Sequence, residues 1–101
     1  MSEEGKPFIL VCQNGFVLFA CRRPSPDDYM FWILDNCCVI RRWGTTRGLG
    51  QLALTGPTSA TEIDPEPDGT ELLKVDVKRA LPVNEEAFKK WIGKLSTAVP
   101  S

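Results

Sequence analysis

The chain has 101 residues, of which 43% are hydrophobic and 25% are charged, and its formal net charge is −1. This composition is typical of a folded globular domain and argues against a disordered chain or a strongly basic nucleic-acid binder. The longest apolar run, near Phe16–Ala20, is much shorter than the about 20 residues of a membrane-spanning helix. We therefore expect one domain over residues 1–101, with frayed ends at residues 1–7 and 96–101.

The N-terminus and the cysteines indicate a cytoplasmic protein. Met1–Pro7 is acidic and lacks the basic start and apolar stretch of a secretion signal. In a reducing compartment the four cysteines are expected to be free thiols. Because the chain has no histidine and its cysteine spacing does not resemble a zinc site, we interpret the cysteines as small buried hydrophobes and expect no metal and no other cofactor.

Two β-prone runs flank Asn14-Gly15, a dipeptide that is typical of a two-residue type I′ hairpin. A turn of this length places Cys12 opposite Val17. One face then carries Phe8, Leu10, Cys12, Val17, Phe19 and Cys21, and the other carries Ile9, Val11, Leu18 and Ala20. Because both faces are apolar, the hairpin is predicted to be central or covered on both sides.

Two further strands are predicted after the turn at Pro24–Asp28. The first spans Tyr29–Leu34 and the second spans Cys37–Trp43, with a turn at Asp35-Asn36 between them. Cys37 and Cys38 should then point to opposite faces of the sheet, because neighbouring strand residues alternate.

A short central helix is expected to be capped by Thr45 or Thr46 and to end near Thr55, before Gly56-Pro57. Residues 57–71 are interpreted as an acidic, proline-rich loop with at most a brief strand near Glu62-Ile63. A strand over Leu72–Leu81 follows, in which Leu73, Val75 and Val77 face inward.

The last predicted element is an amphipathic helix with Asn84 as its N-cap and Val83 placed to contact Phe88. It should run to about Leu95. Its apolar stripe must pack on a sheet or a partner, and consists of Ala87, Phe88, Trp91, Ile92 and Leu95. The predicted fold is therefore α+β, with a small antiparallel sheet of about five strands, an N-terminal hairpin, a short central helix and a C-terminal amphipathic helix.

Several short motifs occur in a characteristic order: Trp43-Gly44, Gly48–Ala53, Gly56, then Leu81–Val83 followed by Asn84–Ala87. This order resembles a family of small uncharacterised proteins encoded by bacteriophages and prophages, over about residues 8 to 92. The loop between Pro57 and Thr70 departs from the family pattern. The resemblance implies a phage or prophage setting and supplies no catalytic residue.

A candidate ligand site lies where arginines end a strand and threonines and glycines open a helix. Free backbone donors at a helix start, together with arginine, can hold a phosphate group. The candidate residues are Arg41, Arg42, Thr45, Thr46, Arg47 and Gly48. The alternative is purely structural: the glycines serve close packing, Trp43 belongs to the core, and the arginines are exposed charges.

The absence of histidine removes the usual general base, so we expect no enzyme and assign no catalytic residue. We favour a non-enzymatic protein-interaction module, an accessory protein that binds another protein through the hairpin edge or a helix surface with Phe88 and Trp91. The alternative is a binder of phosphate, nucleotides or nucleic acid that uses Arg41–Gly50. A homodimer is an open alternative, and no membrane partner is expected.

Overall fold

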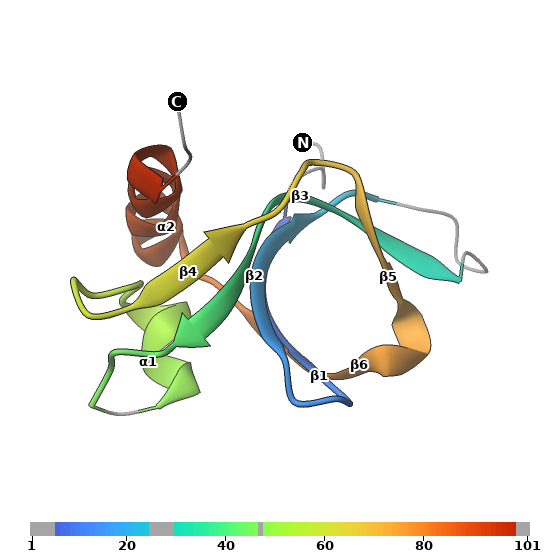
Figure 1. Ribbon diagram of the computed structural model, residues 1–101, viewed down its shortest axis with the longest axis horizontal. Helices are drawn as coiled ribbons and strands as arrows, with labels where there is room; N and C mark the ends of the chain where they lie inside the picture. The colour runs from blue at the N-terminus through green and yellow to red at the C-terminus, as the bar shows by residue number, and fades with distance from the viewer. Residues whose placement is uncertain (1–5, 25–29, 47, 99–101) are drawn as a thin grey trace.

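The computed structural model describes residues 6–24, 30–46 and 48–98. In this part of the chain, six strands form one antiparallel sheet: β1 (Lys6–Cys12), β2 (Val17–Arg22), β3 (Phe31–Arg42), β4 (Glu62–Pro65), β5 (Thr70–Leu73) and β6 (Val77–Pro82). Two α-helices, α1 (Leu49–Leu54) and α2 (Glu85–Ala98), and a 3-10 turn, η1 (Lys74–Asp76), complete the fold. The strand order is β4-β3-β2-β1-β6, with β5 also paired to β3 (Figure 1). The predicted α+β fold is confirmed.

The hairpin is central, as expected, but its register differs by one residue from the prediction. Val11, not Cys12, lies opposite Val17. The connection is larger than a two-residue turn, because the Cys12 amide donates to the Phe16 carbonyl at 2.9 Å and the Phe16 amide donates to Asn14 Oδ1 at 3.0 Å. Every residue of β2 is therefore displaced by one position relative to β1.

This displacement decides which side chains share a face. On one side, Ile9, Val17 and Phe19 pack under α1 and α2 in a helix-side core. On the other side is a second group, the inner core, made of Leu10, Cys12, Leu18, Ala20, Leu34 and Cys37. Both faces of the hairpin are thus covered. All four cysteines are buried free thiols, as predicted, divided between the two cores.

β3 is one long strand, so the predicted turn at Asp35-Asn36 is wrong. Asn36 adopts a φ of 49°, and the pairing of β3 with β2 shifts register beside it, as in a β-bulge. The extra residue lets Leu34 and Cys37 reach the same core, although they are three positions apart. Cys38 lies in the helix-side core, so the expected opposite orientation of Cys37 and Cys38 is confirmed.

The bulge divides β3 into two halves that pair with different strands. The first half pairs with β5, with Trp32 opposite Leu72, and the second pairs with β4, with Ile40 opposite Ile63. From β5 the chain continues through η1 to β6, which pairs with β1 on the edge away from β2. The segment from β5 to β6 therefore faces the concave side of the curved sheet and closes a ring with it (Figure 1). The predicted continuous strand over residues 72–81 is therefore wrong. Val75 lies in η1 and is 77% exposed.

The two helices differ in how well the sequence marks their ends. Asn84 Oδ1 accepts a hydrogen bond from the Ala87 amide at 2.8 Å, which confirms the predicted N-cap of α2. The predicted threonine cap of α1 is wrong, because α1 starts after Gly48 without a side-chain cap. Gly56, at a φ of 90°, follows α1 as predicted. Neither described helix is long and apolar enough to cross a membrane.

Candidate functional site

The arginines of the predicted ligand segment are engaged by carboxylates of the neighbouring strand. Arg41 Nε lies 2.7 Å from Asp64 Oδ2, and its Nη1 lies 3.6 Å from Glu62 Oε1. Arg42 Nε lies 3.8 Å from the other oxygen of Glu62. These pairs link β3 to β4 at the molecular surface, so the carboxylates that hold Arg41 and Arg42 would also repel an approaching phosphate.

Three of the remaining candidates, Thr45, Thr46 and Gly48, lie just before or at the start of α1 and are bonded locally. Thr45 Oγ1 donates to the Gly48 carbonyl at 3.0 Å, and Thr46 Oγ1 lies 3.5 Å from Gln51 Oε1. Gly48 adopts a φ of 83°. Arg47 lies outside the described residues. The structure therefore brings Thr45, Thr46 and Gly48 together but bonds Arg41 and Arg42 to β4.

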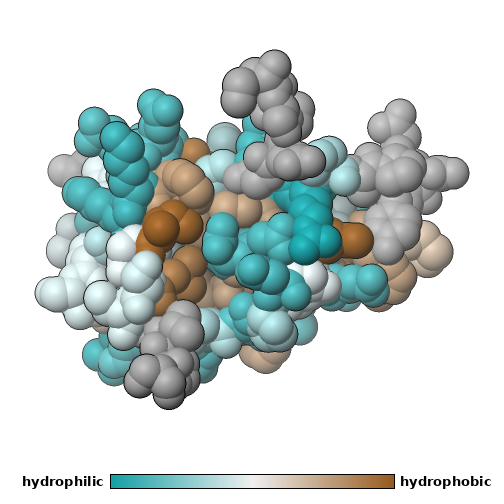
Figure 2. Space-filling model, turned by 90° about the horizontal axis from the view of Figure 1, so that it is seen from above, coloured by the Kyte–Doolittle hydropathy of each residue, from teal (hydrophilic) through white to brown (hydrophobic). Residues whose placement is uncertain are grey.

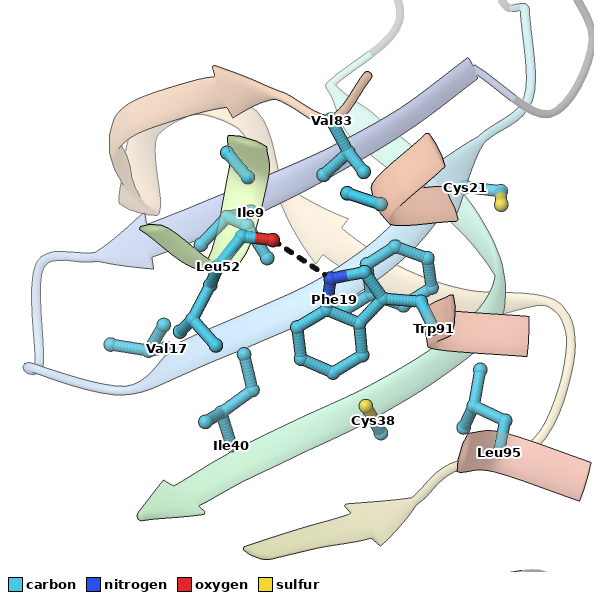
Figure 3. Close-up of a cluster of buried hydrophobic side chains, with 12 residues drawn as sticks. Ile9, Val17, Phe19, Cys21, Cys38, Ile40, Leu52, Val83, Trp91 and Leu95 are labelled. Carbon is cyan, nitrogen blue, oxygen red and sulfur yellow. Dashed lines mark hydrogen bonds between the residues drawn. The ribbon is translucent and has the colours of Figure 1, made fainter. Parts of the chain in front are cut away.

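Trp91 does not form an interaction surface. Its side chain is 0% exposed and stacks on Phe19, with a ring-centroid distance of 4.6 Å and an interplanar angle of 6° (Figure 3). The expectation that Trp91 contacts a partner is therefore corrected: the sheet and α1 already cover its side chain. Phe88 is half-buried, 6.4 Å from the Phe19 ring centroid.

The rim of the helix-side core still reaches the surface. Ile63 of β4 and Ile92 of α2 are half-buried beside it. Figure 2 shows apolar side chains on the side of the molecule that carries α2, with polar side chains around them. Because Ile63 and Ile92 pack against buried residues, the apolar surface that they form is continuous with the helix-side core.

A cavity that the sequence did not suggest opens at one end of the inner core. It has a volume of about 200 Å³. Its apolar lining comes from Cys12, Leu18, Leu34, Val39 and Leu72, and its polar or exposed lining comes from Asn14, Phe16, Glu66, Thr70, Glu71 and Asp76. We call this the inner cavity. The hairpin connection, the middle of β3 and the chain from β4 to η1 all contribute to it.

The carboxylates of the inner cavity differ from Asp35 and from the acidic residues of β4. Within residues 6–24, 30–46 and 48–98, Glu66, Glu71 and Asp76 make no ion pair. By contrast, Asp35 is bonded to Arg23 by two hydrogen bonds of 2.6 and 2.8 Å. The lining residues include no arginine or lysine. The inner cavity is therefore apolar inside and negatively charged around its opening.

Two thiols lie under these carboxylates. Burial raises the pKa of Cys12, and the nearby Asp76 charge raises it further. Burial likewise raises the pKa of Cys37 far above its usual range, with a further contribution from Glu66, whose Oε1 lies 3.7 Å from the thiol sulfur. Both thiols are therefore protonated at neutral pH and are poor nucleophiles.

Exposed apolar side chains lie at the same end of the molecule. Phe16 is 58% exposed at the rim of the inner cavity. The Gln13 amide donates to the Asp76 carbonyl at 2.7 Å, which joins the hairpin connection to η1 and to the exposed Val75. This end of the fold thus combines apolar surface with unpaired negative charge.

Comparison of the chain with protein-family models, with curated proteins and with solved structures finds no match. The inner cavity is therefore interpreted from its own residues. The phage or prophage setting implied by the motif order stays a prediction.

Sequence reasoning missed the inner cavity for a specific reason. The acidic residues near Glu66 and Glu71 were interpreted as a solvated loop, and the predicted hairpin register placed Cys12 and Leu18 on opposite faces. In the observed register both line the same cavity. The acidic clustering was visible in the sequence, but the apolar surface beneath it was not.

Proposed function

We propose that this chain is a non-enzymatic protein-interaction module that binds its partner at the opening of the inner cavity. One observation supports this best: unpaired carboxylates surround an apolar cavity whose rim carries the exposed Phe16. Exposed aromatic side chains beside a pocket are typical anchors of protein interfaces. An accessory role in a phage or prophage is part of the same proposal and is supported by the motif order alone.

The charges and the apolar surface have different roles in this proposal. Burial of the Phe16 ring and the cavity lining against a partner would supply affinity, since removal of apolar surface from water contributes about 25 cal/mol per Å² before the costs of association. The carboxylates would steer a partner of opposite charge and reject one of like charge. Together they would give a specific complex from a small area.

The buried thiols favour binding over catalysis. Cys12 lines the inner cavity, but its pKa is raised by burial and by Asp76, so the thiolate needed for covalent chemistry is scarce at neutral pH. The phosphate or nucleotide binder that uses Arg41–Gly50 remains the second proposal. It has less support, because Asp64 and Glu62 already pair with Arg41 and Arg42.

The proposal is tested by using the protein to capture a partner from a lysate of a bacterial host, and by repeating the capture with variants of the opening of the inner cavity. The double variant E71Q/D76N and the single variant Phe16→Ser change the opening of the inner cavity. The control E85Q/E86Q removes the same number of charges from the exposed start of α2. A second control, Leu54→Ser, removes an exposed apolar side chain from α1.

We expect the parent and both controls to retain the same protein and both cavity variants to lose it. Thermal unfolding of each variant shows that the fold is intact. Equal capture by all five proteins would disprove binding at this site.

A further inference from the structure

We propose that the inner cavity accepts a lysine or arginine side chain of the partner, with the aliphatic stem inside and the cationic head among Glu66, Glu71 and Asp76. This inference rests on the proposed function and names the group that the partner presents. It is carried by the size, the lining and the charge of the inner cavity together.

The size of the inner cavity fits a side chain. Its volume of about 200 Å³ is below the roughly 300–1,000 Å³ of pockets that hold drug-sized ligands. At about 30 Å³ for each water of the liquid, it corresponds to roughly seven waters. The inside of the cavity therefore matches one long side chain better than a drug-sized ligand.

The lining changes from apolar to charged along the direction of entry. Leu18 and Leu34 belong to the buried inner core, whereas Glu71 and Asp76 are exposed. Lysine and arginine have the matching arrangement, because their methylene stems pack on apolar surface while their charged ends stay in a polar environment. An uncharged apolar side chain would fill the inside but leave the carboxylates partly desolvated and unpaired.

The sign of the charge distinguishes among ligands. In the described part of the chain the three carboxylates form no ion pair, and no lysine or arginine lines the inner cavity, whereas Asp35 and Asp64 are paired with arginines. An anionic ligand is repelled by this arrangement. A cation would replace water at these carboxylates and could also contact the face of Phe16, which lies at the rim.

Two small cations test the inference without a partner: n-butylguanidinium, which represents arginine, and n-butylammonium, which represents lysine. Butyrate and n-butanol have similar stems with a negative head and a neutral head. Binding is followed by the amide chemical shifts of Leu18, Leu34 and Leu72 in two-dimensional NMR. The proteins are the parent, E71Q/D76N, and the control E85Q/E86Q.

We expect saturable shifts with at least one cation and none with butyrate, and a dissociation constant about tenfold higher in E71Q/D76N but unchanged in the control. The cation with the lower dissociation constant indicates whether the partner presents arginine or lysine. Equal binding of n-butanol and the cations, or no saturable shift, would overturn the inference.

The outcomes also separate this inference from the proposed function. If capture of a partner depends on Glu71 and Asp76 but neither cation binds, the proposed function stands and the inference is overturned. If a cation binds but capture does not depend on these residues, the proposed function fails, and with it the partner as the source of the cation.

Discussion

The indole Nε1 of Trp91 donates a hydrogen bond to the Leu52 carbonyl at 3.0 Å, which joins α2 to α1 across the helix-side core (Figure 3). Both side chains are 0% exposed. This bond supplies a partner for the carbonyl in a place that the core covers. The bond also explains why Trp91 is not available to a partner. Its indole ring, in the middle of the apolar stripe of α2, already contacts α1 and the sheet.

Replacement Trp91→Phe should therefore be costly. It removes the donor from a buried carbonyl and leaves unfilled volume, so we expect the free energy of unfolding to fall by about 2–4 kcal/mol. Urea denaturation measures the change. The control Trp43→Phe makes the same substitution at a side chain that is 41% exposed, and should cost less than about 1 kcal/mol. Equal losses in the two variants would contradict the role of the Trp91 bond.

Gly44 provides a test of backbone packing. Its φ is 66°, and a Cβ there would lie 2.4 Å from the Ala60 carbonyl carbon and 2.5 Å from the Thr61 nitrogen. This close approach is held by Thr61 Oγ1, which donates to the Trp43 carbonyl. Gly44→Ala should lower the free energy of unfolding by about 2 kcal/mol or more.

The control for Gly44 is Gly50→Ala within α1, where a Cβ would meet no atom within 4 Å. Because alanine favours helix over glycine, this variant should be neutral or more stable by up to about 1 kcal/mol. Chemical denaturation of both proteins measures the difference. A Gly44→Ala protein as stable as Gly50→Ala would show that the segment near Ala60 can move away without cost.

The parts of the fold that could be predicted are those that depend on residues close together in the sequence. The N-cap by Asn84 and the opposite orientation of Cys37 and Cys38 follow from neighbouring residues, and the structure confirms both. The hairpin register did not follow from Asn14-Gly15. There the connection also bonds to η1 through the Gln13 amide, a contact between residues far apart in sequence.

The difference between local signals and long-range contacts also explains which features of the candidate sites could be predicted. Strand order decides which charges meet, so the pairing of Arg41 with Asp64 could not be predicted before β4 was placed beside β3. The inner cavity needed three placements at once: the hairpin register, the bulge between Leu34 and Val39 that lets both line the cavity, and the path of η1. No single motif in the sequence carries that information.

Alkaline pH should destabilise the fold through its buried thiols. Burial raises the pKa of Cys38 from its ordinary value of 9.0 to about 12. Between these values the unfolded thiol loses its proton while the folded one keeps it, so the unfolded state binds fewer protons and stability falls as the pH rises. Well above pH 9, one such thiol contributes a loss of about 1.4 kcal/mol per pH unit.

Urea denaturation at several pH values measures this slope. Burial also raises the pKa of the other thiols, so the informative quantity is the difference between the parent and Cys38→Ala. The variant is expected to start less stable at pH 7 but to lose stability less steeply above pH 9. Parallel pH profiles would mean that the burial of Cys38 does not hold its proton.

The phosphate-binding alternative has its own test. Because Arg41 and Arg42 are paired with Asp64 and Glu62, we expect neither inorganic phosphate nor a nucleoside triphosphate to raise the Tm. Arg41→Ala should change the free energy of unfolding by less than about 1 kcal/mol, since exposed ion pairs contribute little. A saturable rise in Tm that Arg41→Ala abolishes would instead support the alternative.

The charge around the inner cavity should appear in the reactivity of Cys12, the cysteine that lines it. A methanethiosulfonate reagent reacts with the thiolate to form a mixed disulfide and releases methanesulfinate. We expect a cationic reagent to modify Cys12 at least about fivefold faster than an anionic one, since one carboxylate at 4 Å contributes about 1 kcal/mol even in water. Mass spectrometry of peptides identifies the modified residue, and Cys12→Ala is the control for the site.

The ratio of the two rates separates two effects of Asp76. Its charge raises the pKa of Cys12, so D76N should increase the thiolate fraction and accelerate both reagents equally. Its charge also attracts the cationic reagent, and only this effect changes the ratio. In E71Q/D76N the ratio should therefore fall towards one, with a clear rise in the rate of the anionic reagent, and in E85Q/E86Q it should match the parent. An unchanged ratio in E71Q/D76N would show that Glu71 and Asp76 do not set the potential of the inner cavity, and a cationic partner group would then have no electrostatic basis there.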